Sequence, residues 1–509
     1  MKTGFFMNIL YYILGFILLI VIYDMLNRKH TIKSNFPLVG RLRYFLEKIG
    51  PELRQYWVAH NREEQPFDRT WRSYIYASAK KENNLTGFGS DMDFNKNGHF
   101  FIKTSAFPTN INNTINAIAP DALPCAKTIG TRRQKPYRPN SVINISAMSY
   151  GSLGRRATEA NNVGAGKANA FHNTGEGGYS KEYHGRNGTD VVFHIGTGYF
   201  GCGYTDEKGE RQYSHNQLLA LIENNKNIKM IEVKLSQGAK PGKGGILPGK
   251  KVTKEIAKIR GIEKGKDVKS PAYHSAFSNV DGLIEFIERI AKDTGLPVGI
   301  KSAVGKLDFW NELSQKMTKG VGPDFICIDG GEGGTGAAPA AFADNMSLPL
   351  DNAFTAVYKI FQLRGAMADI VWIASGKLGH PTRAAKAFAM GADIINIARE
   401  VMISAGCIQA QICHTGNCPA GIATHKWWLE KGVNVKEKGE RVGSFINTLK
   451  KDLVQVTHAA GYEHPCEFKT DDIVLNTSDV TMRKTFGEVY EYVKTPVRFE
   501  HQLTKELTP

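Results

Sequence analysis

Short runs of apolar residues, each ending in glycine or polar residues, recur along the chain from Val142 onward. Stretches with the helical spacing of apolar residues separate several of these runs, for example Val280–Thr294 and Thr382–Met390. Near-continuous apolar strands that alternate with helices indicate a parallel sheet covered by helices. The seven runs read VINISAMSYG, VVFHIGTG, KMIEVKLSQG, PVGIKSAVG, DFICIDGGEGG, DIVWIASGKLG and DIINIAR. With one further strand they predict an α/β fold of the (β/α)8 TIM-barrel type, and a doubly wound open sheet is the alternative.

Polar residues gather where four of the predicted strands end. They are Lys234 and Gln237, Lys301 and Ser302, Asp329 and Glu332, and Ser375 and Lys377. A charged group in an apolar strand is costly to bury without a partner, so a structural salt bridge would explain any single pair. Because four strand ends share the feature, we expect a common site at the carboxyl ends of the barrel strands.

The chain begins with an uncharged apolar stretch, Phe5–Tyr23, whose nineteen residues are long enough to cross a bilayer as a helix. A cleaved signal peptide is the competing interpretation, but the stretch lacks a strongly basic start and a small-residue cleavage site. Between Asp24 and Arg54 there are seven Lys/Arg and three Asp/Glu, which predicts a cytoplasmic location for the bulk of the protein. We therefore expect a single-pass protein of the cell membrane with its catalytic domain on the cytoplasmic side.

The domain organisation can be predicted from these patterns. We expect a membrane anchor over residues 1–30, a cap or lead-in region over 31–140 with a helix near Arg41–Leu53, and a barrel over 141–430. A helical extension over 431–509 would include the amphipathic stretch Ser444–Ala459.

The net charge and the cysteine content limit which partners and which cellular compartment the sequence predicts. Lys and Arg exceed Asp and Glu by 65 − 49 = 16, which suits an anionic membrane surface or an acidic protein partner. Nucleic acid is the least favoured partner because no nucleic-acid motif accompanies the charge. The seven cysteines show no recognisable disulfide spacing, which is typical of a reducing compartment.

Three cysteines, Cys407, Cys413 and Cys418, fall within twelve residues with the spacing C-x5-C-x4-C. Helical geometry cannot align them in one stripe, so they converge only if the backbone turns, as Gly416 and Pro419 allow. Clustered thiolates on a loop predict an iron–sulfur cluster with three ligands. A Cys3His zinc site completed by His414 and a group of buried cysteines without metal are the alternatives.

Two glycine-rich stretches, Gly196–Gly201 and Gly331–Gly336, match G-x-G-x-x-G. The first continues into a turn-like segment and the second meets Pro339, whereas a dinucleotide fingerprint requires a helix at that point. We therefore discount a Rossmann nucleotide site. Backbone amides after the last two strands, at Ser375–Lys377 and Ala398–Arg399, are the more usual barrel position for a phosphate.

Taken together, these motifs resemble the FMN-binding synthase domain of glutamate synthases, in particular the stand-alone, membrane-tethered FMN-binding glutamate synthase family proteins. The resemblance covers about residues 141–424. The stretches that carry it are NISAMSYGSLG, NTGEGG, KLSQGAKPGKGGILPGKKVTKEIAKIRG, GIKSAVG, IDGGEGGTGAAP, SGKLG and GCIQAQICHTGNCPAGIAT.

The resemblance implies an FMN and a [3Fe-4S] cluster, with Cys407, Cys413 and Cys418 as the cluster ligands. The residues that would contact FMN are Met148, Ser149, Lys301, Gly333, Gly334, Thr335, Ser375, Gly376, Ala398 and Arg399. Lys240 and Arg260 would bind a dicarboxylate substrate, and Glu176 would lie beside the flavin together with the catalytic Lys301.

The implied reaction is the reductive amination of 2-oxoglutarate with ammonia, through 2-iminoglutarate, to L-glutamate. Electrons would come from a ferredoxin or a separate reductase. We expect no glutaminase activity in this chain, because a membrane span stands where an N-terminal catalytic cysteine would be and Cys125 is the first cysteine. Ammonia would then come from solution or a separate glutaminase.

Two departures from the family pattern concern the substrate pocket. Tyr199 stands in GYFG where full-length enzymes have arginine, and Ile246 stands in place of a glutamine. The loss of a cation and an amide favours an alternative function, an FMN-dependent dehydrogenase of another amino or hydroxy acid. A membrane-bound electron carrier without small-molecule turnover is a third hypothesis, because fold and cofactor alone do not determine the chemistry.

Overall fold

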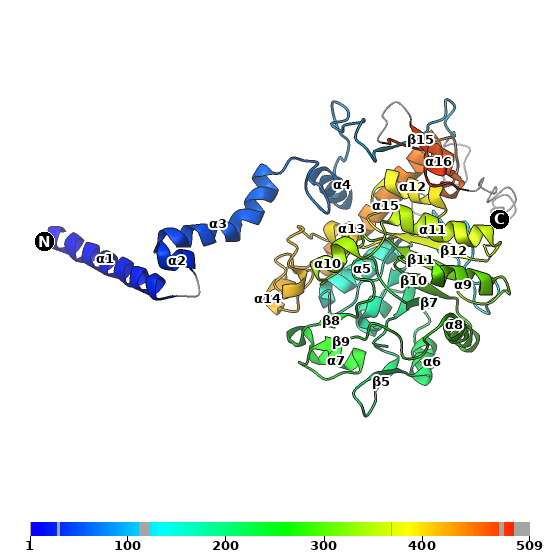
Figure 1. Cartoon of the computed structure of the whole chain (residues 1–509), viewed down its shortest axis with the longest axis horizontal. Coiled ribbons are helices and arrows are strands. Elements are labelled where there is room, and N and C mark those ends of the chain that lie inside the picture. Colours follow the sequence, from blue (N-terminus) through cyan, green and yellow to red (C-terminus); the bar gives the residue numbers. More distant parts are fainter. Residues whose placement is uncertain (1, 28–30, 111–122, 368, 478–482, 493–509) are drawn as a thin grey trace. The chain divides into compact units, whose positions relative to one another are not determined.

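The computed structural model describes residues 2–27, 31–110, 123–367, 369–477 and 483–492 (Figure 1). The chain forms two compact units, Met1–Ser73 and Tyr74–Pro509. The domain boundaries expected at residues 30, 140 and 430 stay predictions.

The first unit is helical. Its helices are α1 (Lys2–Leu26), α2 (Thr31–Asn35) and α3 (Val39–Leu53), followed by a π-helical turn, η1 (Arg54–Val58). Within α1, Phe6–Leu26 is long and apolar enough to cross a membrane, a property that a signal sequence shares. The helix expected near Arg41–Leu53 is confirmed as α3. A further helix, α4 (Arg69–Lys80), leads into the second unit.

The second unit contains a closed barrel of eight parallel strands. In barrel order these are β2 (Ile143–Ile145), β3 (His172–Asn173), β4 (Val191–Ile195), β7 (Ile228–Lys234), β10 (Val298–Ser302), β11 (Phe325–Asp329), β12 (Val371–Ser375) and β13 (Ile394–Ile397). The last strand returns to the first through the pair Ile395 and Ile143. The predicted (β/α)8 barrel is confirmed, and the open-sheet alternative is wrong.

The strand that the sequence pattern missed is β3. It has only two residues, His172 and Asn173. Both are polar, so no run of apolar residues predicts a strand there. Its neighbours define it instead: the His172 backbone N–H donates to Asp190 O at 2.9 Å, and the Ile145 N–H donates to Phe171 O at 3.1 Å. These contacts complete the ladder between β2 and β4.

Helices follow the barrel strands and cover the barrel, and further helices pack outside it (Figure 1). They are α5 (Arg155–Lys167), α6 (His215–Asn224), α7 (Lys254–Arg260), α8 (Val280–Thr294), α9 (Asp308–Met317), α10 (Ala340–Asn345), α11 (Leu350–Leu363), α12 (Pro381–Met390), α13 (Arg399–Ser404), α14 (Trp427–Glu430), α15 (Val435–Ala459) and α16 (Phe486–Val489). The expected helix Val280–Thr294 is confirmed as α8, whose first turn is capped by the Asn279 side chain accepting from Gly282 N at 2.8 Å.

The helix expected over Ser444–Ala459 begins nine residues earlier, at Val435. Close packing against α5 explains the difference. A Cβ at Gly439 would lie 2.5 Å from a Val163 methyl carbon, and one at Gly164 would lie 2.4 Å from a Val442 methyl carbon. Glycine, normally unfavourable inside a helix, is retained here because only a hydrogen atom fits between the two helices.

Segments far apart in the sequence also pair outside the barrel. Strand β1 (Phe100–Ile102), from the expected lead-in region, pairs antiparallel with β14 (Ile473–Leu475), which continues to β15 (Lys484–Thr485). Two two-stranded antiparallel sheets lie outside the barrel: β5 (Gly203–Thr205) with β6 (Arg211–Tyr213), and β8 (Ile246–Leu247) with β9 (Val268–Lys269).

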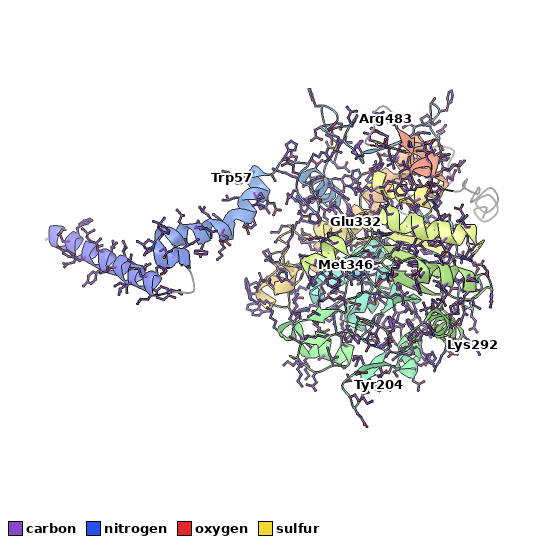
Figure 2. The ribbon with its side chains drawn as sticks, in the orientation of Figure 1. Trp57, Tyr204, Lys292, Glu332, Met346 and Arg483 are labelled. Atoms are coloured by element: carbon purple, nitrogen blue, oxygen red, sulfur yellow. The ribbon has the colours of Figure 1, made fainter. Side chains whose placement is uncertain are left out.

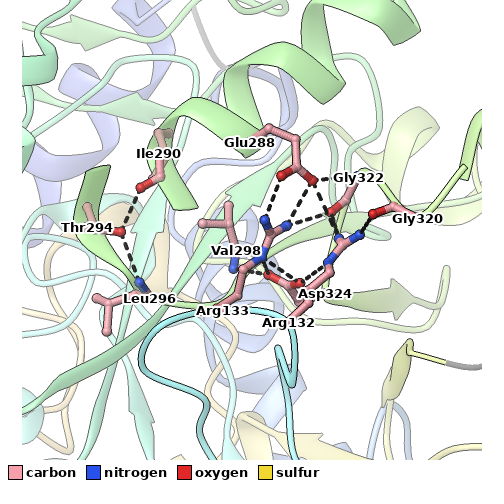
Figure 3. A network of polar contacts seen from close by, with 10 residues as sticks. All are labelled: Arg132, Arg133, Glu288, Ile290, Thr294, Leu296, Val298, Gly320, Gly322 and Asp324. Carbon is pink, nitrogen blue, oxygen red and sulfur yellow. Dashed lines mark hydrogen bonds and ion pairs between the residues drawn. The ribbon is translucent and has the colours of Figure 1, made fainter. Parts of the chain in front are cut away.

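A charged network closes the amino-terminal end of β10 and β11 (Figure 3). Asp324, which is 1% exposed, accepts from Arg132 Nε at 3.1 Å and from Arg133 Nε at 2.9 Å. Arg133 also reaches Glu288 of α8 at 2.6 Å. The other Asp324 oxygen accepts from the Val298 backbone N–H at 2.8 Å, so the network holds the start of β10.

We expect the substitution Arg133→Met to lower the free energy of unfolding by about 2–3 kcal/mol, because it leaves part of a buried carboxylate's charge uncompensated. Urea unfolding followed by circular dichroism measures the change. The control is Lys292→Met, at an exposed position of α8 that Figure 2 labels, and it should alter stability by less than about 0.5 kcal/mol. Equal losses in the two variants would show that the network adds no stability.

Candidate active site

A cavity of about 560 Å³ opens at the carboxyl ends of the barrel strands, and its volume is typical of a cofactor and substrate site. Every barrel strand or the loop after it contributes a lining residue. In strand order these include Met148, Glu176, His194, Lys234, Lys301, Asp329, Ser375 and Ala398. The common site that the strand-end residues predicted is therefore present.

Most of the predicted site residues line this one cavity. They are Met148, Ser149, Glu176, Lys240, Arg260, Lys301, Gly334, Thr335, Ser375, Ala398, Arg399 and Cys413. Gly333, Gly376, Cys407 and Cys418 are not among its lining residues. The role of each residue stays a prediction.

Lys301, on β10, places a buried positive charge at the floor of the cavity. Its Nζ lies 3.5 Å from Asp329 Oδ2, which also accepts from the Gly238 backbone N–H at 3.0 Å. Burial by itself would lower the pKa of Lys301, but the carboxylates of Asp329 and Glu232 raise that pKa above its ordinary value. Lys301 is therefore a protonated ammonium at neutral pH, and it can stabilise negative charge on a ligand in the cavity.

Glu176, after β3, is an ionised carboxylate held by Lys234. Lys234 Nζ lies 2.5 Å from Glu176 Oε1 and 2.6 Å from Gln237 Oε1. Burial would raise the pKa of Glu176, but the charges of Lys234, His194 and Lys240 bring it to about 2. A Cβ at Gly196 would lie 2.9 Å from Glu176 Cγ, so the first glycine-rich stretch makes room for this carboxylate.

The depressed pKa of Glu176 predicts an acid-labile contribution to stability. Because the carboxyl binds protons less readily in the folded chain, its contribution is fully present above about pH 4.5 and is lost as the pH falls towards 2. We expect Glu176→Gln to be less stable at pH 7 and to lose less stability than the wild type between pH 4.5 and 2. Urea unfolding across this pH range tests this, and parallel curves for both proteins would contradict it.

Lys240 and Arg260 bring two further cations to the cavity wall. Lys240 Nζ donates to Ala337 O at 3.0 Å, and Arg260 Nη2 donates to Tyr150 O at 2.8 Å. The Arg260 guanidinium also lies over the Phe200 ring, 4.9 Å from its centre, and its buried Nε has no hydrogen-bond partner in the described part of the chain. Burial lowers the pKa of Lys240, and lowers that of Arg260 to about 10.

Among the described residues, neither Lys240 nor Arg260 lies within 4.0 Å of a carboxylate oxygen. Both side chains are nonetheless almost fully buried, with 7% and 4% of their surface exposed. The Glu176 carboxylate acts on both cations only from beyond contact distance, so an anionic ligand that touches them would compensate their burial further. The wall is therefore suited to carboxylates or phosphates.

Sequence reasoning missed a polar pair inside the barrel, His194 and Glu232. His194 Nδ1 lies 2.7 Å from Glu232 Oε1, which also accepts from Asn173 Nδ2 at 2.8 Å. His194 lines the cavity, and its Nε2 has no hydrogen-bond partner in the described residues. Both residues interrupt apolar strand runs in the sequence, and that interruption was the signal that could have found them.

Of the two departures from the family pattern, only Ile246 changes the cavity surface. Ile246 lines the cavity and is 47% exposed. Tyr199 is fully buried and is not a lining residue; its hydroxyl lies 3.0 Å from His274 Nδ1 and accepts from Ala276 N at 3.1 Å. The effect of Tyr199 on the substrate pocket stays a prediction, because Tyr199 itself does not line the cavity.

The loops after β11, β12 and β13 form one end of the cavity. Arg399 donates from its guanidinium to the Glu332 carbonyl oxygen, and Figure 2 labels Glu332. A Cβ at Gly334 would lie 2.7 Å from Arg399 Cδ, so only glycine permits this approach. Arg399, Ser375, Lys301 and Met148 all line the cavity, and a cation beside a hydroxyl is a combination that can hold a phosphate group.

The cysteine loop is arranged less completely. Burial raises the pKa of Cys413, and the nearby thiol of Cys418 raises it further, while the buried Lys251 opposes both. Lys251 Nζ donates to Cys413 O at 3.0 Å, and Cys407 Sγ accepts from Gln409 N at 3.4 Å. In the described residues, no three His, Cys, Asp or Glu side chains are grouped as a metal site. The described residues therefore do not assemble three metal ligands, and the iron–sulfur cluster stays a prediction.

Comparisons with known proteins agree with this geometry. The family model described as "Conserved region in glutamate synthase" matches residues 101–463. The glutamate synthase large subunit-like protein YerD of Bacillus subtilis is 38% identical, covering 93% of this chain and 95% of YerD. The archaeal glutamate synthase (NADPH) of Archaeoglobus fulgidus is 30% identical, covering 63% of this chain and 58% of that protein.

Among solved structures, a flavocytochrome b2 variant with sulfite bound aligns with 94% of this chain and 98% of its own, at 12% identity and a TM-score of 0.45. The family match spans the barrel and its site, and the YerD match extends over nearly the whole chain. This chain belongs to the glutamate synthase family.

Proposed function

We propose that the protein is an FMN- and iron–sulfur-dependent oxidoreductase that converts 2-oxoglutarate and ammonia to L-glutamate. The observation that carries the proposal is the pair of buried cations, Lys240 and Arg260, in the same cavity as Lys301 and the Arg399 loop. Family membership supports the reaction, and the names of the archaeal relatives state glutamate synthase activity for those proteins.

The two cations would bind the substrate. A dicarboxylate needs two positive groups, and Arg260 can present a planar, bidentate face while Lys240 offers a point charge. Both are positioned by backbone carbonyls, Tyr150 O and Ala337 O, so the charges are held before the substrate arrives. Such fixed groups orient the oxo acid at little entropic cost.

FMN would be held by Arg399, Ser375 and the glycine loop at Gly334, and when bound it would supply the hydride. Lys301 would then stabilise negative charge on the ring, which is the protein's usual means of tuning a cofactor. Glu176 is kept ionised by its ion pair with Lys234, and this pair would hold both side chains in fixed positions in the cavity.

Cys407, Cys413 and Cys418 are proposed as ligands of a [3Fe-4S] cluster because soft thiolates on a glycine-containing loop suit iron and sulfide. A ferredoxin or a separate reductase would deliver electrons, and a separate glutaminase could deliver ammonia. Helix α1 would anchor the protein in the cell membrane with the barrel on the cytoplasmic side.

A second function is favoured by Ile246. This side chain gives the cavity an apolar patch where the family pattern has an amide. An FMN-dependent dehydrogenase of a less polar amino or hydroxy acid would use the same cations for one carboxylate and Ile246 for the side chain.

The test uses the full-length protein purified without oxygen. Flavin absorbance and iron content are measured first, and about three iron atoms per chain are expected for a [3Fe-4S] cluster. The photoreduced protein is then mixed with 2-oxoglutarate and ¹⁵N-ammonium, and labelled glutamate is detected by mass spectrometry. Each substrate alone is the control.

Labelled glutamate formed only with both substrates is the expected result. Oxidation by another oxo acid but not by this pair would favour the second function, and a colourless protein would overturn both. Cys413→Ser should retain FMN and lose most of its iron; an unchanged iron content would remove the cysteine loop from the proposal.

A further inference from the structure

Helix α3 carries an apolar stripe that nothing covers in the described part of the chain. Leu42, Phe45, Leu46, Ile49 and Leu53 recur three or four residues apart, the spacing of one helix face. Leu42 and Phe45 are 56% and 54% exposed, and Trp57, in η1 just beyond the helix, is 85% exposed (Figure 2).

Charged residues lie beside and opposite the stripe on α3. Arg43 pairs with Glu47 at 3.0 Å, and Lys48 and Glu52 lie farther round the helix. Lys33 of α2 stands over the Tyr44 ring, 4.8 Å from its centre, and Arg54 begins η1. Among these six charged residues, four are cations, so the flanks of the stripe carry net positive charge.

The start of α3 is tied to the end of α1. Arg41 donates to both carboxylate oxygens of Asp24, at 2.8 and 2.7 Å, and the Leu38 backbone N–H donates to Asp24 at 3.3 Å. Ser34 Oγ donates to Met25 O at 3.0 Å. Asp24 is fully buried, so breaking its pair with Arg41 would be costly, and α3 keeps its position beside the last turn of α1.

We propose that α3 and η1 lie on the membrane surface, with the apolar stripe inserted among the lipid acyl chains and the flanking cations at anionic headgroups. The inference rests on the proposed membrane span of α1. The position of the stripe favours a membrane as its partner, because the Asp24–Arg41 ion pair holds α3 at the level where the apolar span of α1 ends. The cations beside the stripe also favour a membrane, because Arg43, Lys48 and Arg54 can pair with anionic lipid phosphates.

An in-plane helix next to a single span gives the protein two membrane attachments. At 1.5 Å per residue the fifteen residues of α3 extend about 22 Å along the surface. A helix of this kind buries its apolar face about 5–10 Å deep, near the headgroup boundary, where Tyr56 and Trp57 are well suited.

Depth-dependent quenching tests the proposal with the full-length protein in phosphatidylcholine–phosphatidylglycerol vesicles. Bromine atoms placed near the headgroups or deep in the acyl chains quench tryptophan only on contact. The difference between wild type and Trp57→Phe isolates the contribution of Trp57. Shallow bromines should quench it at least about twofold more than deep bromines, since the helix lies at the boundary.

Two double variants of equal net charge refine the test. Phe45→Gln with Leu46→Gln removes part of the stripe and should reduce quenching of Trp57 by shallow bromines. Glu263→Gln with Lys266→Gln removes an exposed ion pair of the second unit, outside α3 and η1, and should leave it close to wild type.

Flotation of the vesicles distinguishes failure of the inference from failure of the membrane span. A chain that floats with the vesicles but shows no quenching of Trp57 keeps the span of α1 and overturns the inference, because the stripe then faces another protein surface. A chain that does not float overturns the membrane span and the inference together.

Discussion

The substitution Lys301→Met should reduce the rate of glutamate formation by roughly 10²–10³-fold, the size of the loss when one preorganised charge-stabilising group is removed. Lys301 is buried, lies 3.5 Å from Asp329, and stays protonated because neighbouring carboxylates raise its pKa. Its removal withdraws the fixed positive charge from the cavity floor. Steady-state assays with 2-oxoglutarate and ammonium measure the fall in kcat.

The midpoint potential of the proposed flavin cofactor provides a second measurement that needs no substrate. Without Lys301, negative charge on the reduced ring is less stable, so the potential should become more negative. Lys306→Met is the matched control: Lys306 is exposed and follows the same strand, β10. If the two variants had equal potentials and rates, Lys301 would have no role beyond pairing with Asp329.

The substitution Arg260→Met should raise the KM for 2-oxoglutarate by roughly 10²–10³-fold and change kcat much less, because removing one partner of a buried charge pair costs about 2–5 kcal/mol in binding. Arg260 is 4% exposed, is held by Tyr150 O and Phe200, and has no carboxylate partner within 4.0 Å among the described residues. Initial rates over a range of 2-oxoglutarate concentrations measure the effect.

Two further variants in α7 show whether the change in KM is specific to the Arg260 guanidinium. Lys258→Met changes an exposed cation of α7 and should leave KM within about twofold of wild type, as surface substitutions usually do. Arg260→Lys keeps the charge but not the planar fork, so an intermediate KM is expected. A wild-type KM in Arg260→Met would mean that the substrate carboxylate binds elsewhere.

The sequence was sufficient for the features that depend on local pattern. Apolar runs identified seven barrel strands, because a strand buried on both faces needs apolar residues along its whole length. Amphipathic spacing identified α3 and α8, because apolar residues three or four positions apart share one face of a helix. Charged residues at strand ends, such as Lys301, located the cavity because parallel strands place their carboxyl ends on one side.

Only the tertiary structure decided features that depend on contacts between distant segments. His172 and Asn173 form a strand because β2 and β4 offer them backbone partners, and the start of α15 depends on glycines facing α5. The contact of Tyr199 with His274 and the pairing of His194 with Glu232 likewise join residues far apart in the chain. A short stretch of sequence determines helix and strand propensity and the spacing of apolar residues. The contacts between distant segments depend on how the whole chain packs, so no short stretch predicts them.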